Sequence, residues 1–311
     1  MGGSGVIATV VIPTWQRDAW LERCLNAVES QGRHPDQVIV VGRPDDEKAL
    51  AIVDRFAHLP ACWVEVDRPG HVAPVRRGLE AAVGEIVAFL DDDTEPNPAW
   101  LSMLLEPFSD PSVACIGGKV VTHGFKGRVY RDAGRVRWYG KYVGNIGALD
   151  IDRPIEVDGV MEGNWAWRAE VLRSLEFDPC LDFDDASMYG LDLCLQAKKK
   201  GYRIVYQPDA RVNHYVAPRS DELDRSDRPA RTLAYARNYT YLSLKHRHGL
   251  RRLVFLGWWW LIGERGAYGL ATGVADFVCR RNGIRDLVQA SLAGKWKGTR
   301  LWMSTWQGFS S

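Results

Sequence analysis

Three consecutive carboxylates, Asp91, Asp92 and Asp93, follow directly on the apolar run at residues 86–90. A run of this length is typical of a strand buried on both faces, whose carboxyl end is where open α/β folds bind ligands. The three acids repel one another unless a cation lies between them. Mg²⁺ or Mn²⁺ prefers one or two carboxylates together with diphosphate oxygens. The cluster therefore indicates a metal and diphosphate site, with turn and cap residues before the next helix as the alternative.

The elements that must position this cluster alternate along the chain. Short apolar runs at residues 6–12, 38–41 and 62–66 indicate further strands, and apolar stripes at helical spacing lie between them. A later strand is expected at residues 113–121, and a last one at 202–206, before Pro208. This order predicts an α/β fold with a mostly parallel sheet and helices on both faces. The composition, 46% hydrophobic over 311 residues, suits one such domain with an appendage.

The same features resemble family 2 glycosyltransferases of the GT-A fold over residues 6–248. Val10-Val11-Ile12-Pro13-Thr14-Trp15-Gln16-Arg17 looks like their opening strand and nucleotide-binding loop. Gly84 to Asp93 looks like their metal-binding segment, and Gly201 to Ala210, followed by His214, looks like their late helix-strand unit. Together these motifs imply a Rossmann-like GT-A domain that transfers a sugar from a nucleoside diphosphate with inversion.

The resemblance also implies roles for single residues. Asp93 would be the main metal ligand, Asp91 would contact the ribose or the metal, and His214 would approach the metal or the diphosphate. The cofactor would be Mn²⁺ or Mg²⁺. The nucleotide-binding candidates are Pro13, Thr14, Arg17, Arg43, Arg76, Asp91 and Asp92. Arg77 is the neighbouring choice for Arg76, and either one is alternatively a solvated helix position.

Residues 163–168 resemble the segment that holds the transferred sugar and the acceptor. Asn164, Trp165 and Trp167 are therefore candidates for the sugar and acceptor site, because indole rings stack on pyranose faces. The alternative is that alternate residues of a strand pack in the core.

The sequence departs from the family at two places. Where the family carries an acidic pair after the second strand, this chain has Gly42-Arg43-Pro44, so Arg43 is expected to contact a thymine carbonyl, a purine carbonyl or a phosphate. The donor base, in UDP, GDP or dTDP, is left open.

The second departure concerns the carboxylate that accepts the proton of the acceptor hydroxyl. Alignment through the helix at residues 192–195 puts Gly190 at the usual base position, whereas matching Gly190-Leu191-Asp192 to the family's Gly-Glu-Asp makes Asp192 the base. We favour Asp192, with Asp185 and Asp184 as substitutes. The alternative for Asp192 is an ordinary helix N-cap.

The tail combines basic and aromatic residues. From Lys245 onward there are 11 Lys and Arg against Glu264, Asp276 and Asp286, which gives +8 and leaves −7 for the rest of a chain of net charge +1. The apolar run from Leu253 to Ile262 is too short to span a bilayer, but tryptophan with Lys or Arg favours an anionic membrane interface. A helical hairpin on the catalytic domain and a dimer interface are the alternatives.

These expectations give four regions: a flexible leader (1–5), a nucleotide-sugar-binding half (6–110), an acceptor-binding half (111–248) and an amphipathic helical region (249–311). The acceptor would be a glycan or a polyprenyl-linked saccharide, and no nucleic-acid partner is expected. Six dispersed cysteines without a C-x-x-C pair suit a cytoplasmic protein, and the basic, Trp-rich tail suits a peripheral position on the inner face of the plasma membrane. The competing functions are a catalytically impaired nucleotide-sugar or membrane-binding module and a metal-dependent nucleotidyltransferase.

Overall fold

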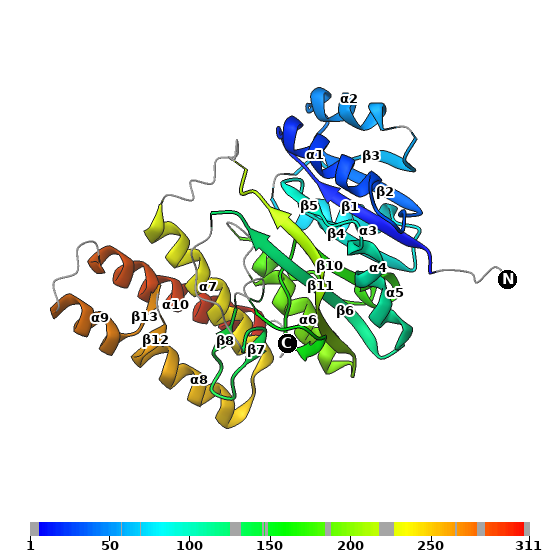
Figure 1. Cartoon of the computed structure of the whole chain (residues 1–311). Helices are drawn as coiled ribbons and strands as arrows, with labels where there is room; N and C mark the ends of the chain where they lie inside the picture. Colours follow the sequence, from blue (N-terminus) through cyan, green and yellow to red (C-terminus); the bar gives the residue numbers. More distant parts are fainter. Residues whose placement is uncertain are drawn as a thin grey trace. The chain divides into compact units, whose positions relative to one another are not determined.

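The computed structural model describes residues 6–56, 58–68, 70–124, 132–144, 146, 149–183, 188–217, 227–264, 266–278 and 284–307. The predicted leader, at residues 1–5, lies outside these ranges. The chain divides into two units, which we describe separately (Figure 1). The first contains Met1–Arg135, Val143–Phe177 and Leu193–Ser220, and the second contains Val136–Tyr142, Asp178–Asp192 and Asp221–Ser311.

The first unit is built on a mixed sheet, and within the described residues nine strands form it, in the order β3-β2-β1-β4-β10-β6-β11-β5, with β9 beside β11. The pairs β1/β2, β2/β3, β1/β4 and β6/β11 are parallel, and β10 is antiparallel to both β4 and β6. The predicted α/β class, with a mostly parallel sheet, is confirmed. The strands are β1 (Ala8–Pro13), β2 (Gln37–Gly42), β3 (Ala61–Glu65), β4 (Ile86–Leu90), β5 (Thr94–Pro96), β6 (Val113–Thr122), β9 (Ile155–Val157), β10 (Asn164–Arg168) and β11 (Arg203–His214).

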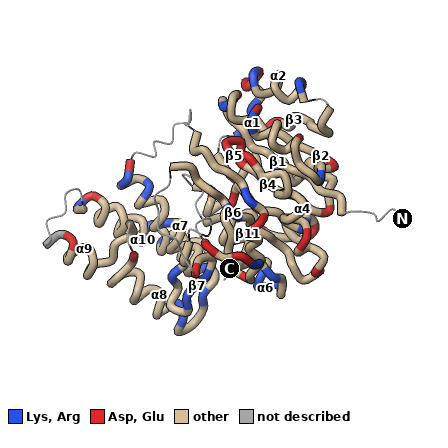
Figure 2. The backbone as a smooth tube through the Cα atoms, viewed as in Figure 1, with Lys and Arg blue, Asp and Glu red and all other residues tan. Residues whose placement is uncertain are grey.

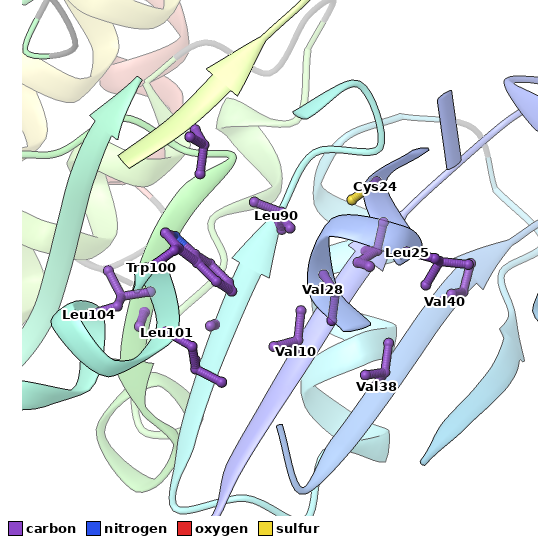
Figure 3. Close-up of a cluster of buried hydrophobic side chains, with 14 of the residues drawn as sticks. Val10, Cys24, Leu25, Val28, Val38, Val40, Leu90, Trp100, Leu101 and Leu104 are labelled. Carbon is purple, nitrogen blue, oxygen red and sulfur yellow. The ribbon is translucent and has the colours of Figure 1, made fainter. Parts of the chain in front are cut away.

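Helices cover both faces of this sheet because its strand residues are apolar on both sides. Figure 3 shows Val10 and Val40 packed against Leu25 and Val28 of α1, with Trp100 of α4 in the same core. On the opposite face α3 approaches closely: a Cβ at Gly78 would lie 2.3 Å from Val11 Cγ1. The helices are α1 (Asp18–Glu29), α2 (Glu47–Arg55), α3 (Val72–Ala81), α4 (Trp100–Leu105) and α5 (Ala169–Arg173), while α6 (Tyr189–Lys199) is divided between the two units after Asp192.

Strand β11 is longer than the sequence predicts. It continues through Pro208 to His214, and its register against β6 shifts between Gln207 and Arg211. Proline lacks a backbone donor and is tolerated at such an irregularity, so the expected end of the strand at Pro208 is wrong. The extension carries His214 alongside β5, where it pairs with Thr94.

The second unit is helical. Its core contains Tyr239 and Leu244 of α7 together with Phe255 and Trp259 of α8. Because α7 shares this core, it lies in the same unit as the C-terminal helices. The helical C-terminal appendage that was predicted with the fold class is confirmed. Its elements are α7 (Arg228–His246), α8 (Gly249–Leu261), β12 (Gly263–Glu264), β13 (Ala267–Tyr268), α9 (Leu270–Val278) and α10 (Ile284–Gln307). Two further short strands in the chain are β7 (Arg135–Val136) and β8 (Tyr142–Val143).

Lys295 of α10 is fully buried within this unit. Its ammonium donates to the carbonyl oxygens of Trp259, Ala267 (3.3 Å) and Tyr268 (2.7 Å), and it lies 4.1 Å from the centre of the Trp259 ring. These carbonyls include one from the last turn of α8 and two from β13, so Lys295 joins three elements. Burial lowers the pKa of Lys295 to about 7, against the opposing effect of Glu264.

This depressed pKa predicts that the protein gains stability as pH rises from 7 towards 10. In that window the unfolded chain holds the Lys295 proton while the folded chain releases it, so the free energy of unfolding increases by at most about 1.4 kcal/mol per pH unit. Urea unfolding of the wild type and of Lys295→Met at pH 6, 7, 8 and 9 measures this contribution. The two curves should diverge above pH 7, and parallel curves would contradict the assignment.

Candidate functional site

The acid cluster forms the turn between β4 and β5. Asp91 is exposed, whereas Asp92 and Asp93 are buried. The turn is closed by Thr94, whose amide and hydroxyl both donate to the carbonyl oxygen of Asp91, at 3.2 and 2.7 Å. Cys24 of α1 donates to the same oxygen, at 3.7 Å. The three carboxylates therefore have different environments although they are adjacent in sequence.

Asp93 is the most heavily contacted of the three. His214 Nε2 lies 3.3 Å from Oδ1, and the backbone N–H of Ala217 donates to Oδ2 at 3.0 Å. Arg17 lies 3.3 Å from Oδ2. Burial acts to raise the pKa of Asp93, but the bonds from His214 and Ala217 and the positive charges outweigh it, so this pKa is lowered. Asp93 is therefore ionised at neutral pH, as a metal ligand must be.

Asp92 contacts the nucleotide-loop residues instead. Arg17 Nη1 donates to Oδ1 at 2.7 Å, and the Thr14 hydroxyl donates to Oδ2 at 2.8 Å. Burial raises the pKa of Asp92 to about 6, although Arg17 and Thr14 act against this shift. Asp92 thus fixes the loop that follows β1, and both of its oxygens are engaged in doing so.

The predicted metal ligands are partly brought together. Asp93 and His214 are in contact, and Asp91 lies in the same turn, exposed. Hydrogen bonding to Asp93 raises the pKa of His214, against the opposing effect of burial. Among the residues that the structure describes, no group of three or more His, Cys, Asp or Glu side chains is arranged to enclose a metal ion. The candidate metal ligands that the structure brings into contact are therefore Asp93 and His214.

The side chains of the segment that was predicted to hold the sugar and the acceptor are buried in the core. Trp165 and Trp167 are 1% and 0% exposed and meet edge to face at 5.4 Å, so the core-packing alternative describes them and neither indole presents a face to a pyranose. Asn164 is also buried; it accepts from Trp100 Nε1 at 2.7 Å and donates to the carbonyl oxygens of Lys119 and Ala210. These bonds tie α4 and β6 to β11. The sequence left both roles open for the two tryptophans, because it shows residue type and not burial.

Gly163, which precedes Asn164, is the residue of this segment that touches the acid cluster. Its carbonyl oxygen accepts from the Asp91 amide at 3.2 Å, and its φ is +84°. A Cβ at this position would lie 2.2 Å from Asp91 Oδ2. Two features therefore favour glycine at this position: its φ is positive, and a Cβ would overlap the carboxylate of Asp91.

The ends of β1 and β2 carry the remaining nucleotide candidates. Pro13 is half-buried at the end of β1, and the Thr14 amide donates to Val41 at 2.9 Å. The guanidinium of Arg43 lies 4.0 Å from the centre of the Trp15 ring, a cation–π pair that the sequence did not reveal. Asp46 is buried and accepts from the amides of Gln16 (2.7 Å) and Ala49 (3.3 Å).

The candidates on α3 are exposed and lie apart from these contacts. Arg77 donates to the Glu65 carbonyl at 3.2 Å and lies 3.5 Å from Glu80. Arg76 is exposed on the same helix. For Arg77 the solvated-helix interpretation fits; a phosphate contact by Arg76 stays a prediction.

The candidate base Asp192 belongs to the second unit and is 1% exposed. Lys245 Nζ donates to Oδ2 at 3.0 Å, and His246 Nε2 lies 2.5 Å from Oδ1. Lys245 also donates to Asp178 at 2.6 Å, and Asp178 accepts from the Tyr241 hydroxyl at 2.8 Å. Because α6 begins at Tyr189, Asp192 lies inside its first turn, and the N-cap alternative is wrong. Asp184 and Asp185 lie outside the described residues.

Nothing in the sequence predicted this buried network. Its bonded members lie as far as 67 residues apart, and Lys245 and His246 lie in the last turn of α7, where basic residues are favoured. No signal in this helix sets the two residues apart, because it also carries Arg228, Arg231 and Arg237.

A family model for glycosyl transferase family 2 matches residues 9–175, which is more than half of the chain and includes the acid cluster. The chain belongs to glycosyl transferase family 2. Within this family it is 28% identical over 262 residues to the pre-mycofactocin glycosyltransferase of Mycobacterium tuberculosis, covering 80% of this chain and 50% of that protein. It is 30% identical over 117 residues to glycosyltransferase AglE of Haloferax volcanii, covering 36% and 38%. The chain thus spans half or less of the length of these relatives.

Solved structures agree with the fold of the family. The mannosyltransferase PcManGT of Pyrobaculum calidifontis, in complex with GDP-Man and Mn²⁺, has a TM-score of 0.58 at 19% identity, with 94% of this chain and 87% of that chain covered. S. aureus TarS residues 1–349 gives 0.57 at 16% identity, with 97% and 91% covered. These similarities establish the GT-A fold.

Proposed function

We propose that this chain transfers a sugar from a nucleoside diphosphate to a hydroxyl of a glycan or lipid-linked acceptor, with inversion and with Mn²⁺ or Mg²⁺. The observation that carries the proposal is the placement of the ionised, buried Asp93 against His214 at the carboxyl end of β4. Support also comes from the family and from two similar structures solved with Mn²⁺: PcManGT with GDP-Man, and GalNAc-T7 with UDP and GalNAc.

The residues present fit a divalent cation that is shared with a diphosphate. A carboxylate oxygen and an imidazole nitrogen, 3.3 Å apart, supply two ligands of types that Mn²⁺ accepts, and the exposed Asp91 lies in the same turn. A bound cation there would neutralise the leaving diphosphate. The chain's own part is to hold Asp93 ionised through Ala217 and to fix the β1 loop through Asp92 and Thr14.

In the same proposal, the Trp15–Arg43 pair contacts the donor base or its phosphates. Asp46 is occupied by two backbone amides, and Arg43, which stacks on Trp15, is a basic group at the end of β2. Replacing Arg43 by Ala should raise the dissociation constant of the nucleoside diphosphate by about tenfold, since one stacked or charge-assisted contact is lost. Isothermal titration with Mn²⁺ present measures this. Arg55→Ala, on the exposed end of α2, is the matched control and should bind as the wild type does.

For the chemical step, the acceptor hydroxyl attacks the anomeric carbon, its proton passes to a carboxylate, and the diphosphate leaves from the opposite face. We propose Asp192 as that carboxylate, with Asp185 or Asp184 as substitutes. Asp192 is held by Lys245 and His246, so its service as a base requires at least one of these contacts to open. Two substitutions of Asp192, to Ala and to Asn, separate its part in this network from a part in proton transfer.

The site and function are tested together by thermal unfolding with UDP, GDP and dTDP, each with and without Mn²⁺. One nucleotide should raise the melting temperature in the presence of metal, because only the folded chain binds it. The corresponding nucleotide sugars should then be hydrolysed or transferred. Binding without turnover would favour the alternative of a catalytically impaired module, and no metal-dependent shift with any nucleotide would refute the proposal.

We further propose that the acceptor is polyprenyl-linked and that the protein works as a peripheral protein on the inner face of the plasma membrane. The support is the basic, Trp-containing tail. None of the helices in the described part of the chain is both long and apolar enough to cross a membrane.

A further inference from the structure

The outer face of α8 is apolar. Its inner face, with Phe255 and Trp259, is fully buried in the core of the second unit. The opposite face carries Leu250, Leu253 and Leu261, which are 75%, 65% and 55% exposed, and Gly257 between them. Spacings of three, four and four residues place these positions in one stripe along the helix. A helix of a globular protein normally turns polar residues to this side, so the stripe needs an explanation.

Helix α9 continues this apolar surface. It packs on α8 and on α10, where Gly273 closes onto Val288. Its outer positions are Leu270 and Val274, which are 49% and 63% exposed, together with the exposed Ala271 and Ala275. We call the combined surface the α8–α9 apolar face and define it by Leu250, Leu253, Leu261, Ile262, Leu270 and Val274.

The charged residues on the two helices are Arg251 and Arg252 at the start of α8 and Asp276 on α9. Helix α8 contains no acidic residue, and its two charged residues, Arg251 and Arg252, lie in its first turn. Beyond that turn α8 is free of charge (Figure 2). Glu264, which follows it, is half-buried and accepts from the Tyr235 hydroxyl. Trp258 and Trp260 are half-buried at the same helix.

We infer that the α8–α9 apolar face seats the protein on a lipid bilayer, with both helices parallel to the surface. Leucines exposed by half or more supply the apolar insertion, while arginine and tryptophan suit the phosphate and headgroup layer. A second copy of this chain fits less well, because the exposed Arg251 would find no carboxylate on a facing α8. Among the described residues from Lys245 onward, the exposed charged side chains are Arg251, Arg285, Lys297 and Arg300 against Asp286, an excess of positive charge that favours anionic lipids.

This inference is independent of the transfer reaction, because it rests on residues of the second unit that take no part in the proposed donor site. If both hold, the protein is retained at the surface on which a lipid-linked acceptor would lie. Binding to vesicles without acceptor or donor therefore tests the surface alone.

The test is co-sedimentation of the full chain with vesicles of phosphatidylcholine, with and without phosphatidylglycerol. The wild type should bind the anionic vesicles more tightly, and added salt should weaken this difference. Leu253→Asp combined with Leu261→Asp should lower the partition coefficient by about tenfold or more, since two apolar side chains on the face become charged. Val83→Asp is the matched control, because Val83 is 72% exposed but belongs to the first unit; it should bind as the wild type does.

Val274→Asp places the same charge on α9 and should also weaken vesicle binding. Because this variant leaves α8 unchanged, it shows whether the loss of binding in the double variant comes only from a local change in α8. Thermal unfolding without vesicles should show all variants folded, because each replaced side chain is exposed. Equal vesicle binding by the wild type and the double variant would overturn the inference. So would a wild-type dimer, seen by sedimentation velocity, that dissociates in the double variant while neither protein binds vesicles.

Discussion

Replacing Asp93 by Asn should abolish the Mn²⁺-dependent rise in melting temperature with nucleoside diphosphate and lower donor turnover by about 10³-fold. Asp93 is the buried carboxylate that contacts His214, Arg17 and the Ala217 amide. The amide of Asn retains the volume but removes the charge on which a cation depends. Thermal shift with the best nucleotide, and single-turnover assays with its sugar, measure the two effects.

The control for this experiment is Asp54→Asn, which makes the same change at an exposed acid of α2. It should leave both readouts unchanged. The melting temperature of Asp93→Asn without ligands separates loss of the site from loss of the fold. If folded Asp93→Asn protein showed a normal metal-dependent rise in melting temperature, Asp93 would not be a metal ligand. Asp91 would then be the next carboxylate to replace.

Replacing Asp192 by Ala should lower the free energy of unfolding by about 2–3 kcal/mol, because His246 loses this carboxylate and Lys245 retains Asp178 alone of the two acids that it contacts. Urea unfolding at pH 7 measures the loss, and Asp286→Ala, an exposed acid of α10, provides the control within the same unit. A loss below 1 kcal/mol would mean that the network contributes little.

The isosteric Asp192→Asn then tests the assignment of the base. If Asp192 is the base, the turnover per folded molecule of the variant should fall by about 10²- to 10⁴-fold, even where most of the stability remains. A residue that only stabilises α6 and α7 should keep its turnover once the unfolded fraction is subtracted. In that case Asp184 or Asp185 becomes the residue to replace next.

Much of the fold follows from local patterns. The strands at β1, β2 and β4 and the stripes of α1 and α2 depend on hydrophobic spacing within short windows, which the sequence displays directly. The place of Asp91 to Asp93 at the end of a buried strand follows from the same patterns. Family membership strengthens this part of the interpretation, because its motifs are contiguous segments.

The sequence alone thus determined an α/β domain of this family and an acidic turn suited to metal and diphosphate. Only the tertiary structure decided which partners these residues meet. His214 reaches Asp93 because β11 passes Pro208 and pairs with β5, and Asp192 meets Lys245 across 53 residues of sequence. The structure also shows that Trp165 is buried in the core and that the α8–α9 apolar face is exposed. Contacts and burial depend on strand register and on packing between distant segments, which spacing along one segment does not encode.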